Sequence, residues 1–461
     1  MSMIIKNGTI VTASNTFRGD VKIEDGVIVA VGSGIEVKEG DKVIDATGQY
    51  VMPGGIDPHT HIGHPDYVDN FEDGTRAAAV GGLTTLGSYL EPPTAGRNLL
   101  QTYEHMKEEA KDSCIDYILN PIINGASVQD FLDNADKLRA AGCGTIKLFM
   151  ASRGMGYYSE DMAQYKMIKR AGELGMNVGD HCENGDVIDT IVAEEVAKGH
   201  TDNIYHGLCR KTYLEGEATK RFISIVKAAG AIGRVVHISC KDAVDELVKA
   251  KEEGLPIVGE TCPQYLLKDI SYLAREFSES AKCICAPPLR EKWHQEVLWD
   301  AIRKGVITTV GSDHAPVAYE GMPVSKVNGR ESFNKVPCGC PGVEDIYPLM
   351  YSEGVAAGRI SLQTFVAITS TNPAKEYGLY PKKGDIAVGF DGDVVVLDPN
   401  RSRTISVKTQ YQKADFNAWE GKTVSGFITH VVSRGEEIVC EGKFIGKKGH
   451  GQFLPAGDIQ L

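Results

Sequence analysis

The chain has 461 residues, of which 42% are hydrophobic and 24% are charged, and its net charge is −13. The length suits a large α/β barrel of roughly 250 residues or more with a smaller companion domain. The acidic balance argues against a nucleic-acid partner, because such proteins present basic patches. No signal-peptide pattern and no apolar run of about 18 residues occurs, so we expect a cytoplasmic protein without a membrane span.

The cysteines give no pattern of a structural zinc site. There are 11 of them, without a CxxC pair. The pairs Cys283/Cys285 and Cys338/Cys340 have CxC spacing, which fits the usual zinc motifs poorly. We expect most of these cysteines to be small buried hydrophobic residues in a reducing compartment.

Short strands are predicted at both ends of the chain. At the N-terminus they are separated by the turn pairs Asn7-Gly8 and Asp25-Gly26, which are typical of hairpins. The expected strands are residues 4–6, 9–11, 21–23, 27–31, 393–397, 426–432 and 437–440. We expect the two terminal segments, 1–52 and 385–450, to form one small β-sandwich, followed by a tail over 451–461 that is mobile or lies on a neighbouring subunit.

Strands and helices alternate in the middle of the chain. Apolar runs at 145–150, 176–181 and 234–238 alternate with amphipathic stretches such as 162–174 and 218–229. This rhythm predicts a parallel sheet buried on both faces. A doubly wound sheet and a (β/α)₈ TIM barrel both fit. We favour a barrel over residues 53–384, because it gathers the residues at many strand ends around one mouth.

A pair of histidines follows the strand-like run 49–52, in Asp57-Pro58-His59-Thr60-His61. Residues i and i+2 of a strand point to the same face, so the imidazoles of His59 and His61 converge. Imidazole nitrogens suit zinc and related divalent metals. On its own the pair fits two packed or surface histidines equally well.

Lys147 interrupts the apolar strand over 145–149. A lysine at a sheet edge, with its amine in water, would look the same. A buried lysine, however, has a lowered pKa and is partly neutral. Its amine can then add CO₂ to form a carbamate, an anionic ligand able to bridge two metal ions.

Three further ligand-type residues lie at or near strand ends: His181, His237 and Asp313. Each has an ordinary structural explanation, namely a hydrogen-bonded core histidine or an aspartate that caps a loop. The six positions together are much harder to explain in that way and predict a metal centre.

The chain resembles the dihydropyrimidinase/hydantoinase family of cyclic amidohydrolases over nearly its whole length. The similar segments are 53–61, 78–85, 145–149, 181–185, 237–239, 260–265, 287–290, 312–314, 371–375 and the C-terminal β segment. Each motif is weak alone, but their number and order are specific.

The resemblance implies two divalent metal ions, with zinc as the expected metal, and a carboxylated lysine at Lys147. His59, His61, Lys147 and Asp313 would hold one ion, and Lys147, His181 and His237 the other. A bridging hydroxide would open a cyclic amide or imide ring to an N-carbamoyl amino acid. Asp313 would act as general base and then as general acid.

The residues expected to contact substrate depart from the family pattern. The family has a tyrosine five residues after the lysine, where this chain has Ser152. Two explanations fit this change equally well: Tyr157 or Tyr158 replaces the tyrosine as the oxyanion donor, or the small serine makes room for a bulkier or more polar substrate. Ala286 and Cys338 stand where the family has serine and asparagine. His64 is a further candidate contact, although a position behind the site or on the surface fits it as well.

Allantoinase shares these motifs and stays an alternative. A non-catalytic relative of the dihydropyrimidinases is disfavoured, because all six ligand positions are filled. Dihydroorotase is disfavoured too, because it carries an arginine two residues after the histidine pair, where this chain has Gly63. The expected partners are a small cyclic substrate and other copies of the chain, as a homotetramer or homodimer.

Overall fold

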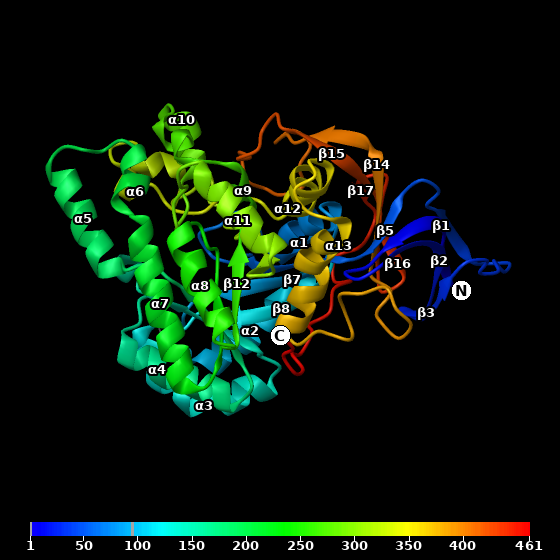
Figure 1. The fold of residues 1–461 in the computed structure, drawn as a ribbon, viewed down its shortest axis with the longest axis horizontal. Helices are drawn as coiled ribbons and strands as arrows, with labels where there is room; N and C mark the ends of the chain where they lie inside the picture. Colours follow the sequence, from blue (N-terminus) through cyan, green and yellow to red (C-terminus); the bar gives the residue numbers. More distant parts are fainter. Residues whose placement is uncertain (1, 94–95) are drawn as a thin grey trace.

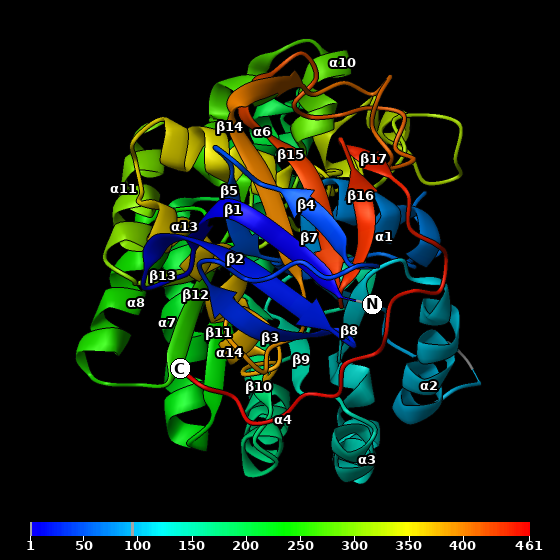
Figure 2. The ribbon, with the colours of Figure 1, turned by 90° about the vertical axis from the view of Figure 1, so that its right-hand side faces the viewer.

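The two ends of the chain share one mixed sheet. The computed structural model describes residues 2–93 and 96–461. The strand order of this sheet is β17-β16-β15-β14-β5-β1-β2-β3, with β4 paired to β1. Figures 1 and 2 show its blue and orange-to-red strands side by side. The strands are β1 (Met3–Val11), β2 (Thr16–Glu24), β3 (Val27–Gly32), β4 (Lys42–Asp45), β5 (Tyr50–Pro53), β14 (Val394–Thr404), β15 (Thr423–Ser433), β16 (Glu436–Cys440) and β17 (Lys443–Phe444).

Eight parallel strands form the middle of the protein in two sheets, β6-β7-β8 and β13-β12-β11-β10-β9. They are β6 (Gly55–Thr60), β7 (Leu83–Leu90), β8 (Asp116–Pro121), β9 (Thr145–Phe149), β10 (Asn177–His181), β11 (Ile232–Val235), β12 (Ile257–Thr261) and β13 (Ile307–Val310). Isolated bridges join the two sheets at both edges, between Ile122 and Lys147 and between Thr60 and His314. Each strand therefore neighbours the next one along the chain.

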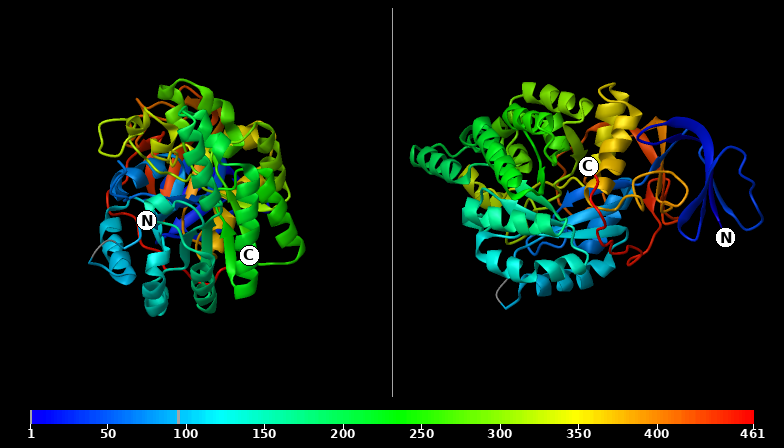
Figure 3. Two further views of the ribbon diagram at one scale, coloured as in Figure 1. Left: turned by 90° about the vertical axis from the view of Figure 1, so that its left-hand side faces the viewer. Right: turned by 60° about the horizontal axis from the view of Figure 1, so that its bottom comes forward.

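Helices follow the parallel strands and lie outside them, as Figure 3 shows. The longer ones are α1 (Phe71–Val80), α2 (Leu99–Glu109), α3 (Val128–Ala140), α4 (Asp161–Glu173), α5 (Gly185–Ala197), α7 (Thr212–Ala229), α8 (Lys241–Glu252) and α11 (Trp293–Arg303). The shorter ones are α6 (Ile204–Cys209), α9 (Pro263–Leu267), α10 (Phe277–Ser280), α12 (Ile346–Met350), α13 (Leu362–Val366) and α14 (Asn372–Glu376). In α8 the buried residues Ala243, Val244, Leu247 and Ala250 recur at helical spacing, so one face packs inward.

The predicted alternation of strands and helices, and with it the α/β class, is confirmed. One boundary differs from expectation. The run 49–52 does not lead into the histidine pair as one strand: β5 belongs to the mixed sheet, and a separate strand, β6, carries His59. Gly54 lies between the two strands, and its N–H donates to the Asp393 carbonyl (2.9 Å). The chain thus passes from one sheet to the other within a few residues.

The C-terminal tail is held on its own chain by backbone hydrogen bonds, which differs from the expected mobile tail. The Gln452 carbonyl accepts a hydrogen bond from the Tyr117 N–H of β8 (3.0 Å), and the Leu454 N–H donates to the Tyr117 carbonyl (2.9 Å). Further along, the Ala456 N–H donates to the Gly142 carbonyl (3.0 Å). The tail therefore adds an extended segment along β8.

A buried cluster of charges ties the mixed sheet to the parallel strands. The Lys383 ammonium lies 2.6 Å from Asp116 on β8, 2.6 Å from Asp393 and 2.8 Å from Asp391. Because a buried charge is costly unless it is paired, these contacts fix the relative position of the two parts. Among the described helices, none combines the length and the apolar character that a membrane crossing needs.

Candidate metal centre

The six predicted ligand residues converge at the carboxyl ends of the parallel strands. His59 lies on β6 with His61 just beyond it, Lys147 lies on β9 and His181 ends β10. His237 and Asp313 follow β11 and β13. All six line one cavity of about 110 Å³. Residues up to 254 positions apart in the sequence thus meet in one place because parallel strands end at a common edge.

The ligand atoms form two groups. His59 Nε2 and His61 Nε2 each lie 3.3 Å from Asp313 Oδ1, and these three residues are a possible set of metal ligands. On the other side, His181 Nδ1 lies 3.1 Å from His237 Nε2. Two atoms that share one tetrahedral zinc ion at about 2.0–2.1 Å would lie about 3.3–3.4 Å apart. Both groups therefore have the separations of ligands that share an ion.

Lys147 lines the same cavity as these two groups and has no partner of its own. Its side chain is fully buried, and its Nζ has no hydrogen-bond partner among the described residues. The amine lies 5.3 Å from the ring centroid of Tyr89 and 5.0 Å from that of Phe149. Burial lowers its pKa to about 8. An unpartnered, largely apolar setting and a partly neutral amine are what carbamate formation requires, so Lys147 fits a bridging ligand.

Two of the histidines each have one ring nitrogen in contact with a buried glutamate. Glu260 on β12 lies 2.6 Å from His59 Nδ1, and Glu183 lies 2.7 Å from His181 Nε2. Such carboxylates fix the ring orientation and tautomer of metal-binding histidines. Burial raises the pKa of Glu260 to about 7. For Glu183 the opposite result holds: the neighbouring Arg210 guanidinium and the hydrogen bond from His181 outweigh the effect of burial and lower its pKa to about 2.

Neither glutamate has a role in the sequence-based prediction, although both lie in motifs that carried the family resemblance. The signal was present for Glu260, a charged residue inside the apolar strand Ile257–Thr261. Its partner, His59, is 201 residues away in the sequence. Without the fold, the pairing of the two residues could not be found.

The backbone near the centre is held in unusual conformations. His237 (φ 40°), Asp313 (φ 52°) and Ser152 (φ 64°) have left-handed backbones although they are not glycines. Asp57 helps to hold this geometry, because its Oδ1 accepts hydrogen bonds from the N–H groups of His59 and Ser312, both at 3.1 Å. Such strain persists only where surrounding contacts enforce it, and it is common at functional sites.

Four of the six predicted substrate contacts line the same cavity, namely Ser152, Tyr157, Ala286 and Cys338. The other two do not. Tyr158 packs under the Arg153 guanidinium (3.5 Å to the ring centroid). His64 lies in a neighbouring depression, with its Nε2 3.2 Å from Glu91. The cavity also contains residues that sequence analysis did not single out: Tyr67, Phe149, Met155, Arg210, Cys285, Ala315 and Gly339.

Gly63, the position at which dihydroorotases carry an arginine, has no room for a side chain. Its backbone is left-handed (φ 86°), and an added Cβ would lie 2.6 Å from the Phe71 ring. The loop therefore cannot accommodate an arginine at this position without rearrangement.

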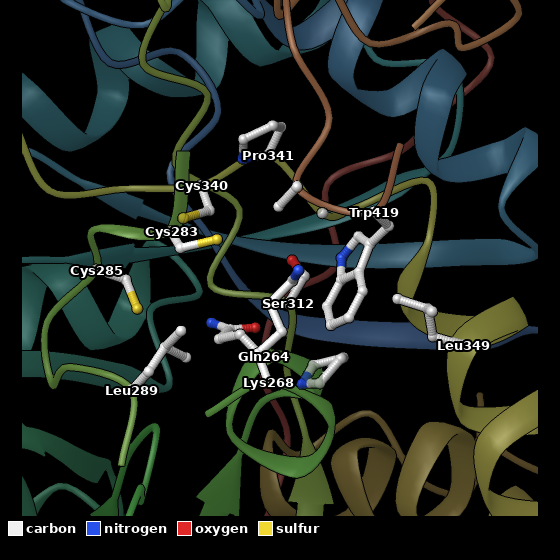
Figure 4. Close-up of a pocket in the computed structure, with 13 residues that line it drawn as sticks. Gln264, Lys268, Cys283, Cys285, Leu289, Ser312, Cys340, Pro341, Leu349 and Trp419 are labelled. Atoms are coloured by element: carbon white, nitrogen blue, oxygen red, sulfur yellow. The ribbon is translucent and has the colours of Figure 1, made fainter. Parts of the chain in front are cut away.

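Cys285 separates the cavity from a second, smaller one of about 20 Å³, shown in Figure 4. The thiols of Cys283, Cys285 and Cys340 line one side of this small cavity and the Trp419 indole lines another. Cys283 and Cys285 are buried, as expected for small hydrophobic residues. Cys285 therefore lines both cavities, whereas Cys283 and Cys340 line only the smaller one.

Comparisons with known proteins identify the family to which the chain belongs. The model of the amidohydrolase family matches residues 50–438. The chain belongs to the amidohydrolase family. It is 44% identical to the D-hydantoinase of Geobacillus stearothermophilus, an alignment that covers 98% of this chain and 96% of the relative.

Two solved structures are also similar over almost their full length. The dihydropyrimidinase of Brevibacillus agri NCHU1002 has a TM-score of 0.94 and 42% identity, with both chains covered completely. The L-hydantoinase (dihydropyrimidinase) of Arthrobacter aurescens has a TM-score of 0.91 and 28% identity over 98% of this chain and 99% of its own. These relatives place the chain in the hydantoinase group of the family, as its sequence motifs predicted.

Proposed function

We propose that this protein hydrolyses the amide bond of a cyclic amide or imide, of hydantoin or dihydropyrimidine type, and releases an N-carbamoyl amino acid. The observation that carries the proposal is the convergence of two ligand groups and the unpartnered amine of Lys147 on one cavity. The similarity to D-hydantoinases and a dihydropyrimidinase supports the ring type.

Two divalent ions, with zinc as the expected metal, would be held by the six residues. His59, His61 and Asp313 would hold one ion and His181 and His237 the other, with carboxylated Lys147 shared between them. When bound, such ions lower the pKa of water to about 7 and polarise a carbonyl group. Asp313 lines the cavity and lies beside both histidines of its group. These contacts support the proposal that Asp313 takes the proton of the attacking water and gives it to the leaving ring nitrogen.

A closed barrel would hold the six ligand residues together at one end of the parallel strands. We propose that the eight parallel strands close into a (β/α)₈ barrel over residues 53–384, and the bridges at both sheet edges support this. The mixed sheet of 1–52 and 385–450 would then be the companion β-sandwich domain. A homodimer or homotetramer stays a prediction, which sedimentation velocity can test.

The experiment that tests the function is a panel of rings with zinc-loaded protein: dihydrouracil, 5-phenylhydantoin, allantoin and dihydroorotate. We expect turnover of dihydrouracil or the hydantoin. Turnover of allantoin alone would instead support allantoinase, the alternative that the sequence left open. Metal analysis should give close to two equivalents per chain, and a fully active protein with one equivalent or fewer would refute the binuclear centre.

A further inference from the structure

Tyr67 is held firmly on the wall of the cavity by the loop that joins β6 to α1. The loop turns at His64, whose carbonyl accepts a hydrogen bond from the Tyr67 N–H (3.1 Å). The phenol ring stacks on the His64 imidazole, with centroids 4.1 Å apart, and meets the His61 ring edge-on at 6.4 Å. The ring is thus fixed between His64 and one of the candidate metal ligands.

His64 is itself held in place from behind. Its Nε2 lies 3.2 Å from Glu91, and its Nδ1 accepts a hydrogen bond from the Asp66 N–H (3.0 Å). The Tyr157 hydroxyl donates a hydrogen bond to the carboxylate of the same Glu91 (2.7 Å). Glu91 therefore clamps the loop after β6 to the loop after β9. This contact also commits the Tyr157 hydroxyl to a carboxylate.

Three residues that line the cavity carry a hydroxyl group that could act as a donor. Within the described part of the chain they are Tyr67, Ser152 and Tyr157. Tyr157 is bound to Glu91, and Ser152 carries a short aliphatic hydroxyl. The Tyr67 hydroxyl has no hydrogen-bond partner among residues 2–93 and 96–461. A phenol is more acidic than an aliphatic hydroxyl, so it is the stronger donor to a developing negative charge.

Hydrolysis of a ring amide creates negative charge on the carbonyl oxygen, and a preorganised donor there stabilises the transition state. We propose that Tyr67 is a catalytic residue that donates this hydrogen bond to the carbonyl oxygen, a role that sequence reasoning had assigned to Tyr157 or Tyr158. The assignment rests on the proposed ring hydrolysis.

The test compares Tyr67→Phe with Tyr157→Phe and Ser152→Ala, each of which removes one hydroxyl. With the best ring of the panel, we expect Tyr67→Phe to lower kcat by about 10²–10³ while KM changes by less than about threefold. Zinc content and melting temperature should equal those of the parent, which separates lost catalysis from a damaged site. Tyr157→Phe and Ser152→Ala should each lower kcat by less than Tyr67→Phe does.

Three outcomes would overturn the assignment. One is a Tyr67→Phe variant with nearly parental kcat. The second is a larger loss in Tyr157→Phe or Ser152→Ala than in Tyr67→Phe. The third is a loss in Tyr67→Phe that accompanies loss of zinc or stability, because the hydroxyl would then be structural. A parent without turnover of any ring would refute the proposed function itself, whereas the three outcomes above arise with an active parent.

Discussion

Replacing Glu260 by glutamine tests whether the carboxylate behind His59 tunes the metal centre. The side chain is fully buried, and its Oε1 lies 2.6 Å from His59 Nδ1. Glu260→Gln keeps the size of the side chain and an acceptor oxygen but removes the negative charge. Loss of such a partner typically weakens metal affinity or activity by about 10–100-fold, which corresponds to about 1.4–2.7 kcal/mol. Because the contact is short and buried, we expect a loss of affinity in the upper half of that range.

Glu376→Gln is the matched control for this experiment. Glu376 belongs to the same buried network, since it lies 2.8 Å from the Arg234 guanidinium, whose other nitrogen lies 3.8 Å from Glu260. It also accepts a hydrogen bond from the Thr309 hydroxyl (2.8 Å), and it touches none of the predicted metal ligands. Both variants replace a buried carboxyl group by an amide of the same size. We therefore expect Glu376→Gln to change zinc affinity by less than about threefold.

The assay is a competition for zinc between metal-free protein and a chromophoric chelator of known affinity, with kcat measured after reloading. A Glu260→Gln variant that binds zinc within threefold of the parent would show that this carboxylate does not tune the metal centre. An equal loss of affinity in both variants would contradict the prediction too, because the effect would then come from any change in the buried network.

Two further predictions follow from Lys147 and His206. Lys147→Ala should lose zinc and activity, and short-chain carboxylic acids should restore part of both. An unmodified Lys147, seen by mass or electron density in a fully active zinc-loaded protein, would contradict the proposal that this lysine carries a carbamate. His206 donates to the Cys285 carbonyl (2.7 Å), and burial lowers its pKa from 6.5 to about 3, so its contribution to stability is complete above pH 6.5 and is lost as the pH falls toward 3. At pH 5 the loss of stability is about 2 kcal/mol. The decrease in unfolding free energy between pH 7.5 and pH 5 should therefore be smaller by about 2 kcal/mol in His206→Gln than in the parent. The same pH dependence in both proteins would contradict the prediction.

Local rules were enough to find most of the candidate metal centre in the sequence. The convergence of His59 and His61 follows from the alternation of side chains along a strand, whatever the rest of the fold does. Lys147 stood out because a charged residue in an apolar strand needs an explanation. The alternation of strands and helices likewise follows from hydrophobic periodicity, which is a property of short segments.

Only the tertiary structure decided which residues surround that centre. Glu260 reaches His59 across 201 positions of sequence, and Tyr157 meets Glu91 across 66. No periodicity encodes such pairs, because they depend on how separate strand ends and loops are packed. For the same reason the sequence selected Tyr157 and Tyr158 by their distance from Lys147 along the chain and overlooked Tyr67, which comes from another loop. Chemistry set by residue type and local spacing could be predicted, whereas chemistry set by contacts between loops required the folded protein.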